Sequence, residues 1–330
     1  MPSFRAYGIL FDGIVAVLLF FVLSGFSLSV NYFASLQVGD PAADLIVRRM
    51  ALARYSRLAL PSLAACLLMY ALSKAGLNYY AHIPNDIKPD WWAWAYRNES
   101  VRFLQTLRFS LYDVFLPGAF IPTVPYEGPY LITNLWTMSI EFVGSILVFL
   151  YVLSVRDSSW RIVLTLAATI ALVQVSSYYA FFFAGALIAD VFLRVKSFDF
   201  PQWTRLTAVA AVIMLFALGR PDEFSWQVIY CTALVFLISM SKPCRSLFGY
   251  ALFRYLGRIS FALYLVHMPI VVSLQSYLYL TLSPSLSLNQ TIALAGSVSI
   301  VASFVTAHFF TYIDQFAIMA SRRFARSIVG

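Results

Sequence analysis

The sequence has 330 residues, of which 61% are apolar and only 12% charged, with a net charge of +8. Soluble domains carry about 25% charged residues, so this composition excludes a soluble protein of this length and indicates a polytopic membrane protein. The positive charge does not indicate nucleic-acid binding, because the basic residues are distributed according to the side of the membrane on which each connection lies.

A helix needs about 20 mostly apolar residues to cross a bilayer. On this rule the sequence predicts an all-α, polytopic transmembrane helix bundle of about nine spans that forms a single domain, 1–330. The predicted helices are Ile9–Val30, Leu58–Leu77, Leu131–Leu153, Ile162–Val175, Tyr178–Leu193, Leu206–Leu218, Trp226–Ser239, Leu256–Leu280 and Gln290–Phe316.

One long connection, residues 78–130, separates the second predicted helix from the third and is rich in Trp, Tyr and Pro. We expect it to be an extracytoplasmic loop that faces the substrate. Trp91, Trp92 and Trp94 are placed as an interfacial aromatic anchor would be.

Lysine and arginine gather on alternate connections, which the positive-inside rule assigns to the cytoplasm. One such connection carries Arg48, Arg49, Arg54 and Arg57, and another follows the last helix. The C-terminus is therefore predicted to be cytoplasmic, and nine spans then place the N-terminus outside. The expected location is the inner or plasma membrane, with lipid as the surrounding partner.

The stretch Leu135–Ser145 places an acidic side chain, Glu141, inside a helix of membrane length. A carboxylate near mid-bilayer costs about 2.5–3.5 kcal/mol on insertion scales, whereas each neighbouring Leu, Ile, Val or Phe returns about 0.3–0.6 kcal/mol. Such residues usually face a bundle interior or a wet cavity, so we predict a functional role for Glu141. The alternative is a carboxylate paired with a buried Arg or hydroxyl for packing alone. Asp190 is expected to be an interfacial residue.

His267 lies near the middle of its predicted span, one turn from Tyr264 and two turns from Ser260. This spacing predicts one polar stripe on the helix. His267 is the preferred functional histidine, and the alternative is a neutral imidazole that bridges helices. His308 is expected to be structural or to line a substrate route, and His82 is expected to have no catalytic role.

Five stretches, taken in order, resemble membrane-bound acyltransferase family 3, the polytopic O-acyltransferases of cell-surface polysaccharides. They are Phe20–Phe26 (FFVLSGF), the arginine cluster 48–57 followed by Pro61, Trp136–Glu141 (WTMSIE), Phe181–Gly185 (FFFAG), and Leu256–Ser260 with Leu263–Pro269. Family members usually have ten helices and begin with a helix that bears an Arg and a His taken to be the base. The resemblance implies that this first helix is absent from the chain.

The resemblance implies transfer of an acyl group, most simply acetyl, from cytoplasmic acyl-CoA to a hydroxyl of an extracytoplasmic carbohydrate. Glu141 and His267 are then the candidate catalytic residues. Guanidinium groups pair well with phosphate, which makes the arginine cluster the candidate cradle for CoA. Its members are Arg54, Arg57, Arg48 and Arg49. The candidate substrate-binding residues are Trp136, Thr137 and Tyr264.

No metal is expected, because the sequence shows no metal-ligand spacing, Gly-rich nucleotide loop or Gly-x-Ser-x-Gly elbow. A secondary transporter or lipid-linked sugar flippase remains an alternative function, and so does a truncated, non-catalytic member of the family. Binding of acyl-CoA separates the family from the transporter, and turnover separates an enzyme from a non-catalytic relative. The sequence names no protein partner.

Overall fold

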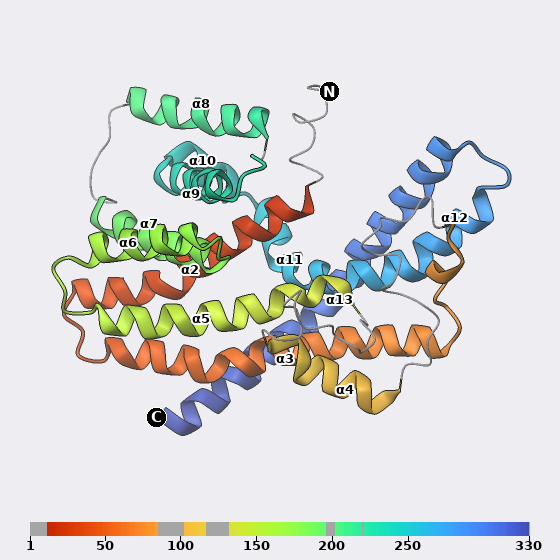
Figure 1. Ribbon diagram of the computed structural model, residues 1–330, viewed down its shortest axis with the longest axis horizontal. Helices are drawn as coiled ribbons and strands as arrows, with labels where there is room; N and C mark the ends of the chain where they lie inside the picture. Colours follow the sequence, from red (N-terminus) through yellow and green to blue (C-terminus); the bar gives the residue numbers. More distant parts are fainter. Residues whose placement is uncertain (1–11, 85–101, 117–131, 196–201, 220, 330) are drawn as a thin grey trace. The chain divides into compact units, whose positions relative to one another are not determined.

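The computed structural model describes residues 12–84, 102–116, 132–195, 202–219 and 221–329, and it is helical without strands over these ranges. Every one of the nine predicted apolar segments is helical there (Figure 1). The predicted anchor of Trp91, Trp92 and Trp94 lies outside the described residues, as does most of the long connection.

The helices fall into long, short and single-turn elements. The long ones are α2 (Gly13–Gln37), α3 (Ala43–Lys74), α5 (Trp136–Ser154), α11 (Ala251–Ile270) and α13 (Leu288–Val329). The shorter ones are α4 (Phe103–Leu111), α6 (Arg161–Gln174), α7 (Tyr179–Val195), α8 (Gln202–Leu218), α9 (Phe224–Met240), α10 (Lys242–Phe248) and α12 (Ser276–Leu282). A π-helix, η7 (Val271–Gln275), joins α11 to α12, and 3-10 turns lie at η2 (Tyr80–His82), η4 (Asp113–Phe115) and η6 (Thr133–Leu135).

Among the described residues, five helical stretches are long and apolar enough to cross a membrane. They are 13–37, 43–74, 133–154, 251–282 and 288–329, and a sixth exists if α9 and α10, bent by 92° at their junction, count as one span. The transmembrane all-α class is thus confirmed. The number of nine spans stays a prediction, because α6 and the apolar part of α8 are shorter than a bilayer crossing requires.

Two helices extend well beyond their predicted ends. α3 begins at Ala43 rather than at Leu58, and α13 continues to Val329 rather than ending at Phe316. Charged residues end an apolar run without ending a helix, because Arg and Lys are good helix formers. The four arginines of the cluster therefore lie on α3 itself, not on a connection before it.

The chain forms two compact units whose segments alternate along the sequence. Unit 1 contains residues 1–52, 140–254 and 325–330, and unit 2 contains residues 53–139 and 255–324. The helices α3, α5, α11 and α13 contribute residues to both units. Function as a single domain stays a prediction from the sequence.

In unit 1, α7 packs against α2, α6 and α9 (Figure 1). The backbones of α2 and α7 approach closely at two glycines. A Cβ atom on Gly25 would stand 1.9 Å from the carbonyl oxygen of Phe182, and one on Gly185 would stand 2.0 Å from that of Val22. Small residues permit such approach. Two of the motif stretches are therefore the facing surfaces of one helix pair.

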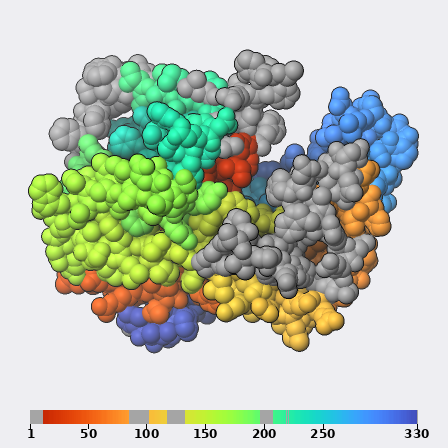
Figure 2. Space-filling view, viewed as in Figure 1, coloured from red at the N-terminus to blue at the C-terminus, as the bar shows by residue number. Residues whose placement is uncertain are grey.

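The outer side of α6, the yellow-green helix at the left of Figure 2, carries exposed apolar side chains. They include Val163, Leu164, Leu166 and Ile170. An apolar helix face of this kind requires cover by lipid or by another helix. This surface agrees with a membrane environment.

Unit 2 contains a helical hairpin. α11, η7 and α12 form its first arm, and α13 returns after the short connection 283–287. Pro269, which lacks a backbone N–H, stands two residues before the π-helix. The Tyr79 N–H donates to the carbonyl of Val272 at 3.2 Å, and the rings of Tyr79 and Tyr277 lie 5.1 Å apart. The chain that leaves α3 is thereby attached to the π-helix.

Candidate functional site

An open groove of about 670 Å³ runs along α11 and η7 in unit 2, with α13 forming its other wall. Its polar lining consists of Ser260, Tyr264, His267, Gln275, Ser299 and Ser303. Its apolar lining consists of Leu256, Ile259, Leu263, Val271, Ile300 and Phe304, and Gly296 completes the wall. From residue 256 to residue 275 the groove follows α11 and η7 for about 28 Å, which approaches the thickness of a bilayer's hydrocarbon core.

The predicted polar stripe of α11 faces this groove, since Ser260, Tyr264 and His267 all line it. Nδ1 of His267 lies 3.1 Å from the carbonyl oxygen of Leu263, one turn earlier. A carbonyl only accepts hydrogen bonds, so this contact requires the proton on Nδ1. The neutral ring then carries its lone pair on Nε2, which suits the acceptance of a proton.

Tyr264 is held by the start of α5. Its Oη atom lies 2.6 Å from Oγ1 of Thr137 and donates to the carbonyl of Asn134. The amide of Asn134 in turn donates to the main-chain carbonyl of Tyr264. The Tyr264 ring lies 5.9 Å from the ring of His267. Thr137 and Tyr264, two predicted substrate-binding residues, therefore contact each other and fix the side chain beside His267.

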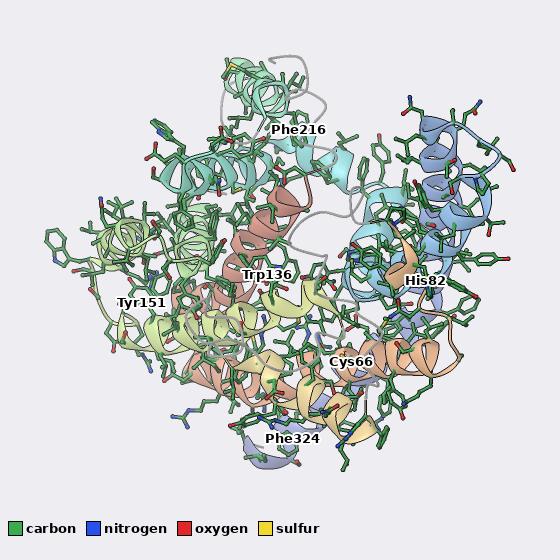
Figure 3. The ribbon with its side chains drawn as sticks, turned by 45° about the vertical axis from the view of Figure 1, so that its right-hand side comes forward. Cys66, His82, Trp136, Tyr151, Phe216 and Phe324 are labelled. Atoms are coloured by element: carbon green, nitrogen blue, oxygen red, sulfur yellow. The ribbon has the colours of Figure 1, made fainter. Side chains whose placement is uncertain are left out.

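Two further residues singled out by the sequence lie outside the groove lining. Trp136 begins α5 and is half-buried, and His82 is exposed at the end of η2 (Figure 3). Neither is among the residues that line the groove. A role for Trp136 in substrate binding stays a prediction.

Glu141 is 1% exposed within α5 and belongs to unit 1, whereas His267 belongs to unit 2. Its Oε1 atom accepts a hydrogen bond of 2.7 Å from the hydroxyl of Ser24 on α2, and its main-chain carbonyl accepts one from Ser145. The predicted buried carboxylate inside a membrane-length helix is confirmed, and it has a hydroxyl partner. A catalytic role for Glu141 stays a prediction.

The four clustered arginines of α3 differ in exposure. Arg54 is only 7% exposed and is engaged with other residues of the protein, and Arg49 is half-buried. Arg48 and Arg57 are exposed, and the charge of Arg57 interacts with Asp314 of α13. Exposure therefore favours Arg48 and Arg57 as contacts for phosphate.

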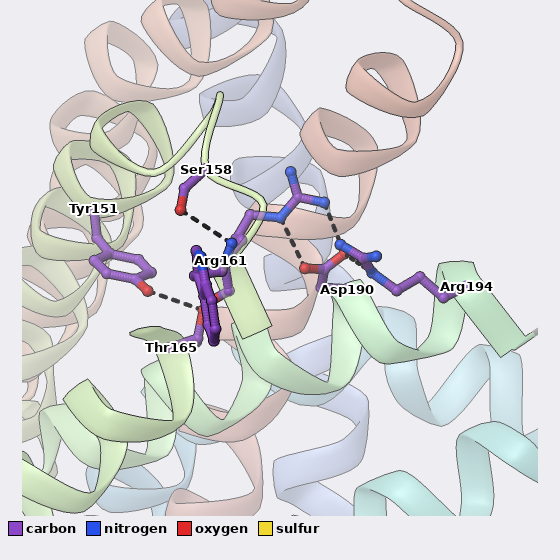
Figure 4. A network of polar contacts seen from close by, with 7 residues as sticks. Tyr151, Ser158, Arg161, Thr165, Asp190 and Arg194 are labelled. Atoms are coloured by element: carbon purple, nitrogen blue, oxygen red, sulfur yellow. Dashed lines mark hydrogen bonds and ion pairs between the residues drawn. The ribbon is translucent and has the colours of Figure 1, made fainter. Parts of the chain in front are cut away.

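A buried ion-pair network in unit 1 joins α6 to α7 (Figure 4). Nε and Nη2 of Arg161 each lie 2.8 Å from an oxygen of Asp190, and Nε of Arg194 lies 3.1 Å from the same carboxylate. The side chains of Arg161 and Asp190 are 8% and 1% exposed. Asp190 is thus paired with a bidentate arginine inside the protein, and its position at the membrane interface stays a prediction. The i, i+4 spacing of Asp190 and Arg194 was the signal in the sequence.

Sequence reasoning did not predict the wall that α13 contributes. Gly296, Ser299 and Ser303 recur at i, i+3 and i+7, the spacing of one helix face, and this was the available signal. Among the described residues no cluster of three His, Cys, Asp or Glu side chains could hold a metal ion.

Known proteins resemble this chain over most of its length. The sequence profile of the acyltransferase domain matches residues 2–308, a range that contains the groove and Glu141. The O-acetyltransferase PaAT-1 of Phomopsis amygdali is 28% identical over 322 residues, covering 81% of this chain and 63% of that relative. The chain thus spans less than two thirds of the relative's length. No solved structure matches the chain.

Proposed function

Because the chain belongs to this acyltransferase family, we propose that it is a membrane O-acyltransferase that moves an acyl group from cytoplasmic acyl-CoA to a hydroxyl of an extracytoplasmic carbohydrate. The fungal relative is named as an O-acetyltransferase, which supports acetyl as the group transferred. The observation that carries the proposal is the ring of His267, which lines the groove with Nδ1 bonded to Leu263 and Nε2 left to act as a base.

In the proposed reaction, Nε2 of His267 accepts the proton of the acceptor hydroxyl while the hydroxyl oxygen attacks the thioester carbonyl. The new C–O bond forms, the C–S bond breaks, and CoA leaves as a thiolate that recovers the proton from the imidazolium. The bond from Nδ1 to Leu263 holds the ring in one orientation through both transfers. A base positioned in this way contributes about 10²–10⁴-fold to the rate.

The residues around the groove are proposed either to position His267 or to bind the acyl donor. Thr137 supports the ring of Tyr264, which packs beside the imidazole, so both are proposed as positioning residues. Glu141 is proposed to fix α5 at its contact with Ser24, one turn beyond Thr137. The exposed guanidinium of Arg57 is proposed to contact the phosphates of CoA.

The proposal is tested with membranes that contain the chain, supplied with acetyl-CoA labelled in the acetyl group. We expect label in carbohydrate esters that mild alkali releases, and none in membranes that contain the His267→Gln variant at equal abundance. Movement of an intact sugar across the membrane with no ester formed would contradict the proposal and favour a transporter.

A further inference from the structure

We infer that the groove between α11 and α13 holds the uncharged pantetheine arm of the acyl donor, and that Gly296 and Ser299 determine where this arm lies. This inference rests on the proposed function and assigns the length of the groove to the donor, while the acceptor hydroxyl has to reach the groove only at His267. The charge, the polar groups and the open space of the groove wall support it.

The groove wall is long, carries no permanent charge and is largely apolar. None of its thirteen lining residues is a Lys, Arg, Asp or Glu, and about half are aliphatic or aromatic. Phosphate would lose its hydration there without a counterion, which excludes the nucleotide part of CoA. A sugar ring would press hydroxyls against Leu256, Ile259 and Leu263, and each unpaired hydroxyl costs about 1–3 kcal/mol. A linear chain with a few amides suits this wall.

The hydroxyl of Ser299 is one of the polar groups on the wall that can pair with a ligand. Ser299 is 3% exposed, and its Oγ has no hydrogen-bond partner among the described residues. Ser29 and Ser273 instead donate to the carbonyl four residues earlier. The hydroxyls of Ser62 and Thr291 are also buried without a partner among the described residues, but neither of them lines the groove. An unpaired buried hydroxyl costs about 1–3 kcal/mol, so a ligand amide that pairs with Ser299 recovers this loss, whereas a lipid tail does not.

The amide of Gln275 is another such group, and the π-helix keeps it on the groove wall. An α-helix turns about 100° per residue, so the eight residues from His267 to Gln275 would carry the side chain about 80° beyond two full turns. The wider i→i+5 turn of η7 rotates each residue by less and restores the register. Gln275 therefore lines the same wall as His267, about 12 Å away along the helix.

Gly296 of α13 leaves open space in the groove wall. A Cβ atom on Gly296 would meet no atom within 4 Å, in contrast to Gly25 and Gly185, which are required for helix packing. A helix-interior glycine costs about 0.5–1 kcal/mol relative to alanine, and no packing contact of Gly296 explains that cost. A side chain at this position would enter the groove that Gly296 lines. The glycine thus keeps the groove open for a ligand.

The experiment compares Gly296→Leu with Gly257→Leu. Gly257 lies on α11, where an added Cβ atom would also meet no atom within 4 Å, and it does not line the groove. Calorimetry of the purified full chain with acetyl-CoA is expected to show wild-type affinity for Gly257→Leu and at least tenfold weaker binding for Gly296→Leu. Equal binding by both variants overturns the inference alone. A wild-type chain that binds no acetyl-CoA overturns the proposed function and the inference with it.

A second measurement uses the same two positions as cysteines. The native cysteines, Cys66, Cys231 and Cys244, are all buried, so a thiol reagent reports on the introduced residue. We expect acetyl-CoA to protect Gly296→Cys from the reagent and to leave Gly257→Cys reactive. Protection of Gly296→Cys by added phospholipid but not by acetyl-CoA would identify a lipid site and overturn the inference.

Discussion

Replacement of Gly25 by alanine is predicted to force α2 and α7 apart. The new Cβ atom would lie 1.9 Å from the carbonyl oxygen of Phe182, whereas ordinary contact begins at 3.4 Å, so the helices must separate by about 1.5 Å. The obstacle is main chain and cannot rotate away. A gap of 0.5–1 Å already forfeits about a quarter to a half of the dispersion energy between facing atoms. Overpacking of this kind costs about 1–3 kcal/mol.

Thermal unfolding of the purified protein in detergent, followed by near-UV circular dichroism, measures this cost. A loss of 1 kcal/mol lowers Tm by about 2–4 °C in a domain of 150–250 residues, so a decrease of several degrees is expected for Gly25→Ala. Gly257→Ala is the matched control, because its methyl group meets open space and alanine favours a helix by about 0.5–1 kcal/mol. A Gly25→Ala protein that unfolds at or above the wild-type Tm would refute the packing argument.

Three further substitutions test other contacts. Asp190→Ala leaves Arg161 buried without its carboxylate partner and is expected to lower the free energy of unfolding by about 3–5 kcal/mol in the same assay. A decrease below about 1 kcal/mol would show that the pair is not buried. Ser24→Ala removes the hydroxyl donor to Oε1 of the buried Glu141, and a buried acceptor left without its donor costs about 1–3 kcal/mol, so this variant is expected to lose more stability than Glu141→Gln, which keeps an acceptor. Arg57→Ala is expected to raise KM for acetyl-CoA several-fold at unchanged kcat, and an unchanged KM would remove this residue from the donor site.

The sequence was informative where the signal is local. Nine apolar runs predicted helices, and all nine are helical over their described residues, because a backbone surrounded by apolar groups must satisfy its own hydrogen bonds. The start of α3 at Ala43 was missed because a charged stretch carries no hydropathy signal, although it has good helix propensity. The two-unit arrangement depends on contacts between distant segments, which no local pattern encodes.

In the candidate site too, features within one helix were predictable and contacts between helices were not. The stripe of Ser260, Tyr264 and His267 was predictable because one helix places i, i+4 and i+7 on one face. The contact between Ser24 and Glu141 joins residues 117 positions apart, and that between Arg161 and Asp190 joins residues 29 apart. Such pairs arise from packing of separate helices, so spacing within the sequence cannot reveal them.

The most direct test of the central claim is single-turnover transfer of labelled acetyl from acetyl-CoA by the wild type, His267→Gln and His308→Gln. His308 is an exposed histidine of α13 whose Nδ1 lies 3.1 Å from Oη of Tyr255, and it does not line the groove. If His267 is the base, His267→Gln still binds acetyl-CoA but transfers acetyl about 10²–10⁴-fold more slowly, whereas His308→Gln keeps the wild-type rate. A His267→Gln protein that transfers acetyl at the wild-type rate would contradict this role.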